Sequence, residues 1–190
     1  MATNWPIRYS AISADGRLIA IAGRRGLTHY SSTSGRWKLF GDEFQELAFT
    51  VMGGLLWFHH VLIAAVEVGR SWQVSMENYA LLRVFLKLVQ LRLYSRDLEL
   101  SNQNVLHHEP LTSPVVILSL VDNSLLVYTT DNNLLHYLVV PTAETIELHF
   151  AGSISFDGVI ANPNAVRALS WMVPAAQKRM FLWIIQEAIF

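Results

Sequence analysis

The first forty residues of this sequence divide into four short runs separated by turn residues. Asp15-Gly16 is a tight-turn dipeptide, and the apolar run Leu18–Ala22 follows it directly. Three further glycines separate the later runs. Four short strands and three turns within residues 5–40 are typical of one blade of a β-propeller. A single blade cannot cover both of its faces, so this segment predicts that similar units follow.

The same order of turn and apolar run recurs along the chain. His59-His60, Asp122-Asn123 and Asp157-Gly158 are turn dipeptides, and an apolar run follows each of them. The predicted strands are 61–66 and 91–94 in the second unit, 125–129, 134–140 and 146–149 in the third, and 165–172 in the fourth. Propellers close with about four to eight blades. We therefore expect an all-β fold: an incomplete WD-repeat-like β-propeller of about three blades and part of a fourth, over residues 1–179.

The second unit is interrupted by residues 74–90, VSMENYALLRVFLKLVQ. Apolar side chains recur there at intervals of three and four residues, and most of the residues are good helix formers. This pattern predicts an inserted helix near 76–90.

The insert also has features of a retained intron. The nucleotides of an extended splice donor can encode Val74-Ser75, and those that usually end a splice acceptor can encode Gln90. The insert is a whole number of codons, so its retention would preserve the reading frame. Removing residues 74–90 joins Trp72-Gln73 directly to Leu91-Arg92. A retained intron and a genuine lineage-specific helix are both open interpretations of this segment.

An apolar stretch at 48–68 is long enough to cross a bilayer. Gly53-Gly54 and His59-His60 divide it into two short runs rich in aromatic and branched residues, and imidazoles at the membrane centre are costly. We predict a strand, a turn and a strand here, with a membrane span, and so a small membrane protein, as the alternative. The first residues show no basic segment followed by an apolar core, so no secretory signal is expected.

The composition restricts the classes of partner. The net charge is -1 and 15% of the residues are charged, which does not favour nucleic acid as a partner. Hydrophobic residues make up 52% of the chain, a high proportion that indicates further apolar surfaces to be covered. Cysteine is absent, which fits a cytosolic protein.

Histidine and arginine supply the candidate site residues. The neighbouring imidazoles of His59-His60 and of His107-His108 would point to opposite faces of a strand, so we interpret both pairs as solvated turn residues rather than metal ligands. His29 lies in an apolar strand and is interpreted as a structural, hydrogen-bonded histidine. The turn 23–26, Gly-Arg-Arg-Gly, is interpreted as a surface turn, with an anion site or a contact to an acidic partner as alternatives.

Motifs for nucleophilic catalysis and for phosphate binding are missing from the sequence. It contains no Gly-x-Ser-x-Gly elbow and no glycine-rich phosphate loop before a helix. We therefore expect no catalytic, cofactor-binding or metal-binding residue, and no enzyme activity in the chain itself.

Two tracts of the sequence resemble one protein family. The first contains WPIRYSAIS, DGRLIAIAGRRGL, HYSS and SGRWKLFGDE and continues to residue 58; the second, from residue 91 to about 179, contains LRLYSRDLELSNQN, VDNSLLVYT and AVRALSWM. Both tracts resemble the opening part of the large, WD-repeat-like subunit of the Golgi Rab exchange complex, the RIC-one (ribosome control) family. Without residues 74–90 the chain would continue as that family does, whereas 180–190 would be a divergent tail from a truncated gene model or a divergent last strand.

The resemblance implies a function in membrane traffic. It implies a propeller scaffold within a guanine-nucleotide exchange factor that pairs with a small arrestin-like subunit and activates a Rab-six-type GTPase. The expected location is cytoplasmic and peripheral at the Golgi membrane, in retrograde endosome-to-Golgi and intra-Golgi traffic. A propeller scaffold of another coat or tethering complex is the alternative.

Overall fold

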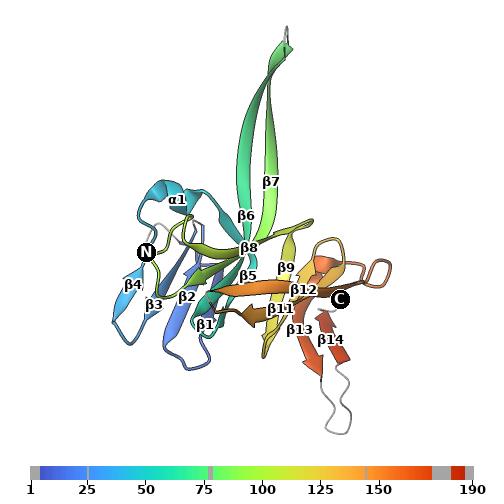
Figure 1. Ribbon diagram of the computed structural model, residues 1–190. Helices are drawn as coiled ribbons and strands as arrows, with labels where there is room; N and C mark the ends of the chain where they lie inside the picture. The colour runs from blue at the N-terminus through green and yellow to red at the C-terminus, as the bar shows by residue number, and fades with distance from the viewer. Residues whose placement is uncertain (1–4, 25, 77–78, 144, 173–180, 187–190) are drawn as a thin grey trace.

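The computed structural model describes the backbone of residues 5–24, 26–76, 79–143, 145–172 and 181–186. Within these residues the chain forms consecutive antiparallel sheets that lie next to one another in chain order (Figure 1). Each four-stranded sheet is a meander in which every strand pairs with its neighbour in sequence. The three meanders and a final two-stranded sheet form the array of blades that the repeated turns predicted.

The strands of each sheet are bounded as follows. The first sheet contains β1 (Tyr9–Ile12), β2 (Leu18–Ala22), β3 (Leu27–Ser31) and β4 (Arg36–Lys38). The second contains β5 (Thr50–Phe58), β6 (Val61–Met76), β7 (Tyr79–Ser95) and β8 (Val105–Leu111). The third contains β9 (Val115–Val121), β10 (Ser124–Thr129), β11 (Asn133–Pro141) and β12 (Ile146–Ser155), and the last pairs β13 (Val166–Met172) with β14 (Phe181–Gln186).

Two short helical segments connect the sheets. The helix α1 (Glu43–Leu47) follows the first sheet, and the Asp42 side chain accepts a hydrogen bond from the Gln45 backbone N–H at its start. The 3-10 turn η2 (Pro163–Ala165) precedes β13. Within the stretch expected as a divergent tail, Phe181–Gln186 forms β14.

The hydrophobic core lies between neighbouring sheets. Side chains alternate along a strand, so Leu62 on β6 packs in the cluster shared with the first sheet, whereas Ile63 packs in the cluster shared with the third. On β10, Leu125 belongs to the cluster shared with the second sheet and Leu126 to the cluster with β13. Each inner sheet is therefore apolar on both faces, which is the packing of propeller blades.

Backbone geometry confirms the predicted turns. Gly16, Asp122 and Asn132 have φ of 70°, 54° and 60°, in the left-handed region that these residue types tolerate best. The stretch 48–68 is a strand, a turn at His59-His60 and a strand, as predicted. Among the described helices, none is both long enough and apolar enough to cross a membrane.

The predicted helix near 76–90 is wrong. Residues 79–90 belong to β7, which pairs with β6 to form a long hairpin that projects from the body (Figure 1). The register runs unbroken from Val61 opposite Ser95 to Val74 opposite Leu82, so strands formed in the core extend into the insert. The sequence of the insert is apolar at nearly every second and every third position, so its periodicity did not distinguish helix from strand.

This hairpin predicts the outcome of removing residues 74–90. The register places Ala65 opposite Leu91, so joining residue 73 to residue 91 keeps the pairs from Val61–Ser95 to Ala65–Leu91 and leaves 66–73 as the connection. The deletion also removes the buried Val89 side chain and its pairing with Leu111. Because the entropy of closing a loop changes slowly with loop length, we expect the free energy of unfolding, measured by thermal denaturation, to fall by about 1–3 kcal/mol, mostly through the loss of Val89. Leu91→Ala, which removes a fully buried side chain, should cost more, about 2–5 kcal/mol.

Sequencing of the transcript and folding of the shortened chain together distinguish the two interpretations of the insert. Under the intron interpretation, reverse-transcribed message contains mostly the form that lacks the codons for 74–90. If every transcript keeps those codons and the shortened chain does not fold, the insert is an essential part of the protein.

Candidate functional site

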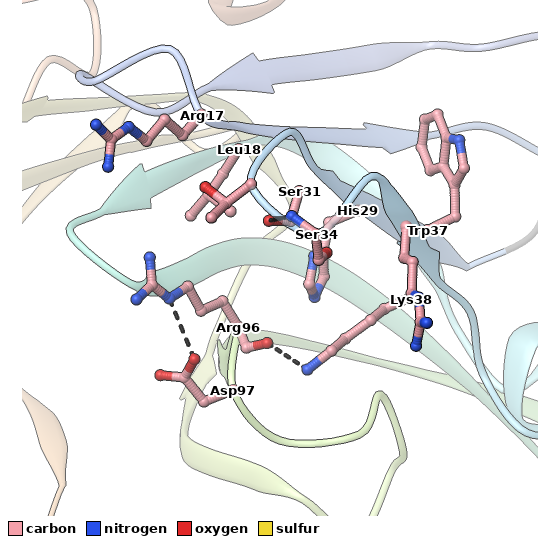
Figure 2. Close-up of a pocket in the computed structure, with 11 residues that line it drawn as sticks. Arg17, Leu18, His29, Ser31, Ser34, Trp37, Lys38, Arg96 and Asp97 are labelled. Carbon is pink, nitrogen blue, oxygen red and sulfur yellow. Dashed lines mark hydrogen bonds and ion pairs between the residues drawn. The ribbon is translucent and has the colours of Figure 1, made fainter.

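A pocket of about 560 Å³ lies where the turns of the first sheet meet the β7–β8 loop of the second. Four basic side chains and one acidic side chain line it, namely Arg17, Arg36, Lys38, Arg96 and Asp97. The buried imidazole of His29 also lines it, and Figure 2 shows this ring near the Lys38 side chain and the Arg96 backbone. This basic pocket is the candidate site.

Arg17 is placed at the rim by the turn between β1 and β2. The Ser13 hydroxyl donates to Asp15 at 2.5 Å and accepts from the Leu18 N–H at 2.9 Å. The Arg17 N–H donates to the same carboxylate at 3.1 Å. The hydrogen bond from Ser13, followed by that from Arg17, holds the pKa of Asp15 below its usual range, so this turn is fixed by an ionised carboxylate and presents Arg17 to solvent.

Arg36 and Lys38 reach the pocket from β4, on either side of Trp37. The β3–β4 turn is closed by the Gly35 N–H, which donates to the Ser31 carbonyl at 2.9 Å. The Lys38 ammonium donates to the Arg96 carbonyl and, at 3.0 Å, to the Leu98 carbonyl. Lys38 therefore ties the first sheet to the β7–β8 loop across the pocket (Figure 2).

Arg96 and Asp97 form the opposite wall. The Arg96 N–H donates to the His60 carbonyl at 2.9 Å, and the Asp97 N–H donates to the Ser95 hydroxyl at 3.1 Å. The Arg96 guanidinium lies 3.2 Å from the Asp97 carboxylate. These hydrogen bonds hold the backbone of the loop in place. The exposed Arg96 side chain therefore starts from a fixed backbone position at the edge of the pocket.

His29 is buried, with 2% of its surface exposed. Burial, with a contribution from the Lys38 charge, lowers its pKa to about 4, so the imidazole is neutral at physiological pH. Its ring meets the Trp57 ring edge-on at 5.5 Å between centroids. Neither ring nitrogen has a hydrogen-bond partner within the described structure, and the same holds for the Trp57 indole nitrogen.

This geometry corrects one expectation for His29. The strand position and the burial are as predicted, but the predicted hydrogen bond is wrong. The ring meets the Trp57 ring edge-on, and the ammonium group of Lys38, the residue opposite His29 on β4, donates instead to the Arg96 and Leu98 carbonyls. A buried polar group without a partner destabilises a fold by about 1–3 kcal/mol, so this imidazole is the least expected feature of the first sheet.

The paired histidines are placed by the turns and edges of the second sheet. His59 and His60 form the exposed turn that was predicted. His107 and His108 lie instead in the edge strand β8, not in a turn, and His107 is 3.8 Å from the Glu109 carboxylate. No cluster of metal-binding side chains is found among the residues that the structure describes.

The described residues of the turn at 23–26 do not line the pocket. Arg24 is exposed, on the turn between β2 and β3, and does not line it. Arg25 lies outside the described residues. Sequence reasoning missed the pocket because its basic residues come from three separate segments; the local signal was the alternation of Arg36 and Lys38 on one short strand.

Comparison with known proteins gives the family. The family model described as "RIC1 second beta propeller domain" matches residues 1–188. The chain belongs to the RIC1 family. The description specifies a second propeller, whereas the sequence resemblance was assigned to the opening part of the large subunit.

Curated relatives of the chain are guanine nucleotide exchange factor subunits. The subunit ric1 of Schizosaccharomyces pombe is 32% identical over 177 residues, which cover 92% of this chain and 15% of that protein. The subunit RIC1 of Homo sapiens is 26% identical over 190 residues, covering 98% of this chain and 12% of that protein. RIC1 of Mus musculus is 48% identical over 63 residues, 33% of this chain and 4% of that protein. Over nearly its full length the chain thus spans 12–15% of the first and second of these relatives.

Proposed function

We propose that this chain is a propeller scaffold of a guanine-nucleotide exchange factor subunit that activates a Rab-six-type GTPase. In this proposal the chain acts with a small arrestin-like subunit at the cytoplasmic face of Golgi membranes, in retrograde endosome-to-Golgi and intra-Golgi traffic. The observation that carries it is the match of residues 1–188 to a RIC1 propeller, together with relatives named as exchange factor subunits.

The architecture is suited to a scaffold. Loops connect the strands at the edges of the sheets, whereas the packed cores between the sheets hold the strands in place. Binding residues are commonly found on such loops. Nucleotide exchange opens the nucleotide pocket of a GTPase through protein contacts, so it requires no catalytic side chain in the exchange factor. The lack of a nucleophile or phosphate-loop motif in the sequence is compatible with this mechanism.

The test measures release of labelled GDP from the Rab-six-type GTPase of the same organism. We expect the full-length family protein that contains this chain, purified with its small subunit, to accelerate release at least about tenfold, which corresponds to about 1.4 kcal/mol of barrier. The 190-residue chain alone should leave the rate unchanged, because it spans only a small part of its relatives.

Rab proteins of other pathways are the control, since an exchange factor distinguishes its GTPase by differential affinity. Unchanged release with the full complex would exclude the Rab assignment. Co-purification with coat or tethering proteins instead of an arrestin-like subunit would support the alternative scaffold.

A further inference from the structure

The end of β3 and the turn that follows it carry four consecutive hydroxyl residues, Ser-Ser-Thr-Ser at 31–34. Positions 32–36 are exposed. Ser34 lines the basic pocket (Figure 2). The Ser32 N–H donates to the Arg17 carbonyl at 2.9 Å, so this turn adjoins the segment that presents Arg17. A hydroxyl that is accessible to a protein kinase therefore lies beside the cationic groups of the pocket.

Two guanidinium groups near this hydroxyl are available to a new anion. Arg36 follows Ser34 by two residues, and none of the described residues forms an ion pair with it. Arg17 is 3.9 Å from the Asp15 carboxylate, and 68% and 52% of these two side chains are exposed, so this ion pair is of the kind that contributes little to stability. Lys38, in contrast, is engaged by two backbone carbonyls.

Exposed cations of this kind suit a phosphate that the chain itself carries better than a free anion. A free anion must be held by its contacts alone, whereas a phosphate on Ser34 is kept beside Arg36 by its ester bond, which gives it a high effective concentration there. A phosphoserine has a charge of about −1.5 to −2 and three acceptor oxygens. These oxygens match the planar donors of a guanidinium group, which can bind them in pairs.

We propose that Ser34 is a phosphorylation site for a kinase that recognises a basic residue two positions after the acceptor, and that Arg36 and Arg17 hold the phosphate. The Ser34 hydroxyl oxygen bonds to the γ-phosphorus of ATP while the bond from that phosphorus to ADP breaks, and the hydroxyl proton passes to the catalytic base of the kinase. The phosphate lowers the positive charge of the pocket rim and links the β1–β2 turn to the β3–β4 turn. The proposal rests on this turn and is independent of the exchange activity.

The first test asks whether a kinase reaches the turn in the folded chain. The full chain and a peptide of residues 28–40 are incubated with the catalytic domain of protein kinase C and magnesium ATP, and mass spectrometry locates the phosphate. We expect Ser34 to be the main site in both, because the turn is exposed and Arg36 provides the basic residue. The modification of this turn should be lost in Ser34→Ala.

The second test asks whether the two arginines hold the phosphate. Phosphoserine is incorporated at position 34 of the full chain through an expanded genetic code, and its ³¹P chemical shift is followed as the pH changes. Nearby cations favour the dianion, so we expect the second pKa of the phosphate to fall from about 6 to about 5.5 or lower, and Arg36→Gln to remove most of that change. Phosphoserine at position 153, an exposed site on β12 that does not line the pocket, is the matched control and should keep the ordinary pKa. Circular dichroism confirms that each variant is folded.

Three results would overturn the proposal. Phosphate at Ser34 in the peptide but not in the full chain would show that the fold closes the turn to kinases, and phosphate at Ser34 in neither would show that its sequence is not recognised. Equal phosphate pKa values at positions 34 and 153 would show that the arginines do not hold the group. A lowered pKa at position 34 that persists in both Arg36→Gln and Arg17→Gln would have another source.

Discussion

Replacing Gly53 by alanine should lower the free energy of unfolding by about 3–5 kcal/mol, because it combines overpacking with backbone strain. Gly53 has φ of 93°, which side-chain-bearing residues rarely adopt. A Cβ atom added there would lie 2.5 Å from both the Val115 carbonyl oxygen and its Cγ1. The Gly53 N–H also donates to the Tyr9 hydroxyl at 3.1 Å. This one position therefore joins all three four-stranded sheets, and thermal or urea unfolding should show the loss directly.

Two further glycine substitutions separate the effect of overpacking from that of backbone strain. Gly54→Ala also introduces a side chain at positive φ, 129°, but the added Cβ would meet no atom within 4 Å. We expect it to cost about 1–3 kcal/mol, the strain alone. Gly152→Ala has neither strain nor a contact and should change stability by no more than about 0.5 kcal/mol. Equal effects for Gly53→Ala and Gly54→Ala would contradict the close approach of β5 to Val115.

Replacing His29 by phenylalanine should stabilise the chain in the absence of a ligand. The substitution keeps an aromatic edge against Trp57 and removes two buried nitrogens that have no partner. At pH 7 we expect the free energy of unfolding to rise by about 1–2 kcal/mol. A gain in stability of this size would show that the two ring nitrogens of His29 are also without hydrogen-bond partners in solution.

The effect of His29→Phe should grow as the pH falls. The pKa of His29 is lowered from 6.5 to about 4 in the native state, so between these values the unfolded chain binds a proton that the native chain does not. Stability from the neutral imidazole is fully present above pH 6.5 and is lost as the pH falls toward 4, by about 3 kcal/mol in all. Chemical unfolding at a series of pH values should show this slope in the parent chain and a smaller slope in His29→Phe.

His60→Gln serves as the control for the pH series, because His60 is an exposed turn residue. Its pH profile should follow that of the parent chain. If His29→Phe and the parent chain lose stability in parallel, the imidazole of His29 is hydrogen-bonded or hydrated in solution.

Local chemistry made most of the sheets predictable. Asp15-Gly16, Asp122-Asn123 and His59-His60 mark turns because their residue types tolerate the backbone angles that hairpins need, and this requires no knowledge of distant residues. The runs between them alternate or are continuously apolar, according to whether one or both faces are buried. Each four-stranded sheet is a simple meander, so strands that are neighbours in the sequence are also neighbours in the sheet.

Three features depend on contacts outside their own segment and were not predicted correctly. The insert forms a strand because its residues in β7 pair with β6. The secondary-structure propensities of residues 76–90 contain no information on that pairing. The pocket is lined by Arg17, Lys38 and Arg96, which come from separate segments of the chain. Only the packing of two sheets places these side chains around one pocket. The hydrogen bond expected for His29 required knowing which atoms face the ring, which a single strand does not specify.

The contiguity of each sheet has a consequence for how the protein is made. The first sheet is complete once residue 38 has been synthesised, and the second needs nothing beyond residue 111. Among the described strands, none pairs with a strand of another sheet. Each sheet can therefore form its hydrogen bonds as it leaves the ribosome, and the later event is the docking of finished sheets through their apolar faces. Gly53 lies at that docking contact. A translational pause after the second sheet would therefore leave exposed the apolar face that packs against Val115, and we expect the chain to need a chaperone most during that pause.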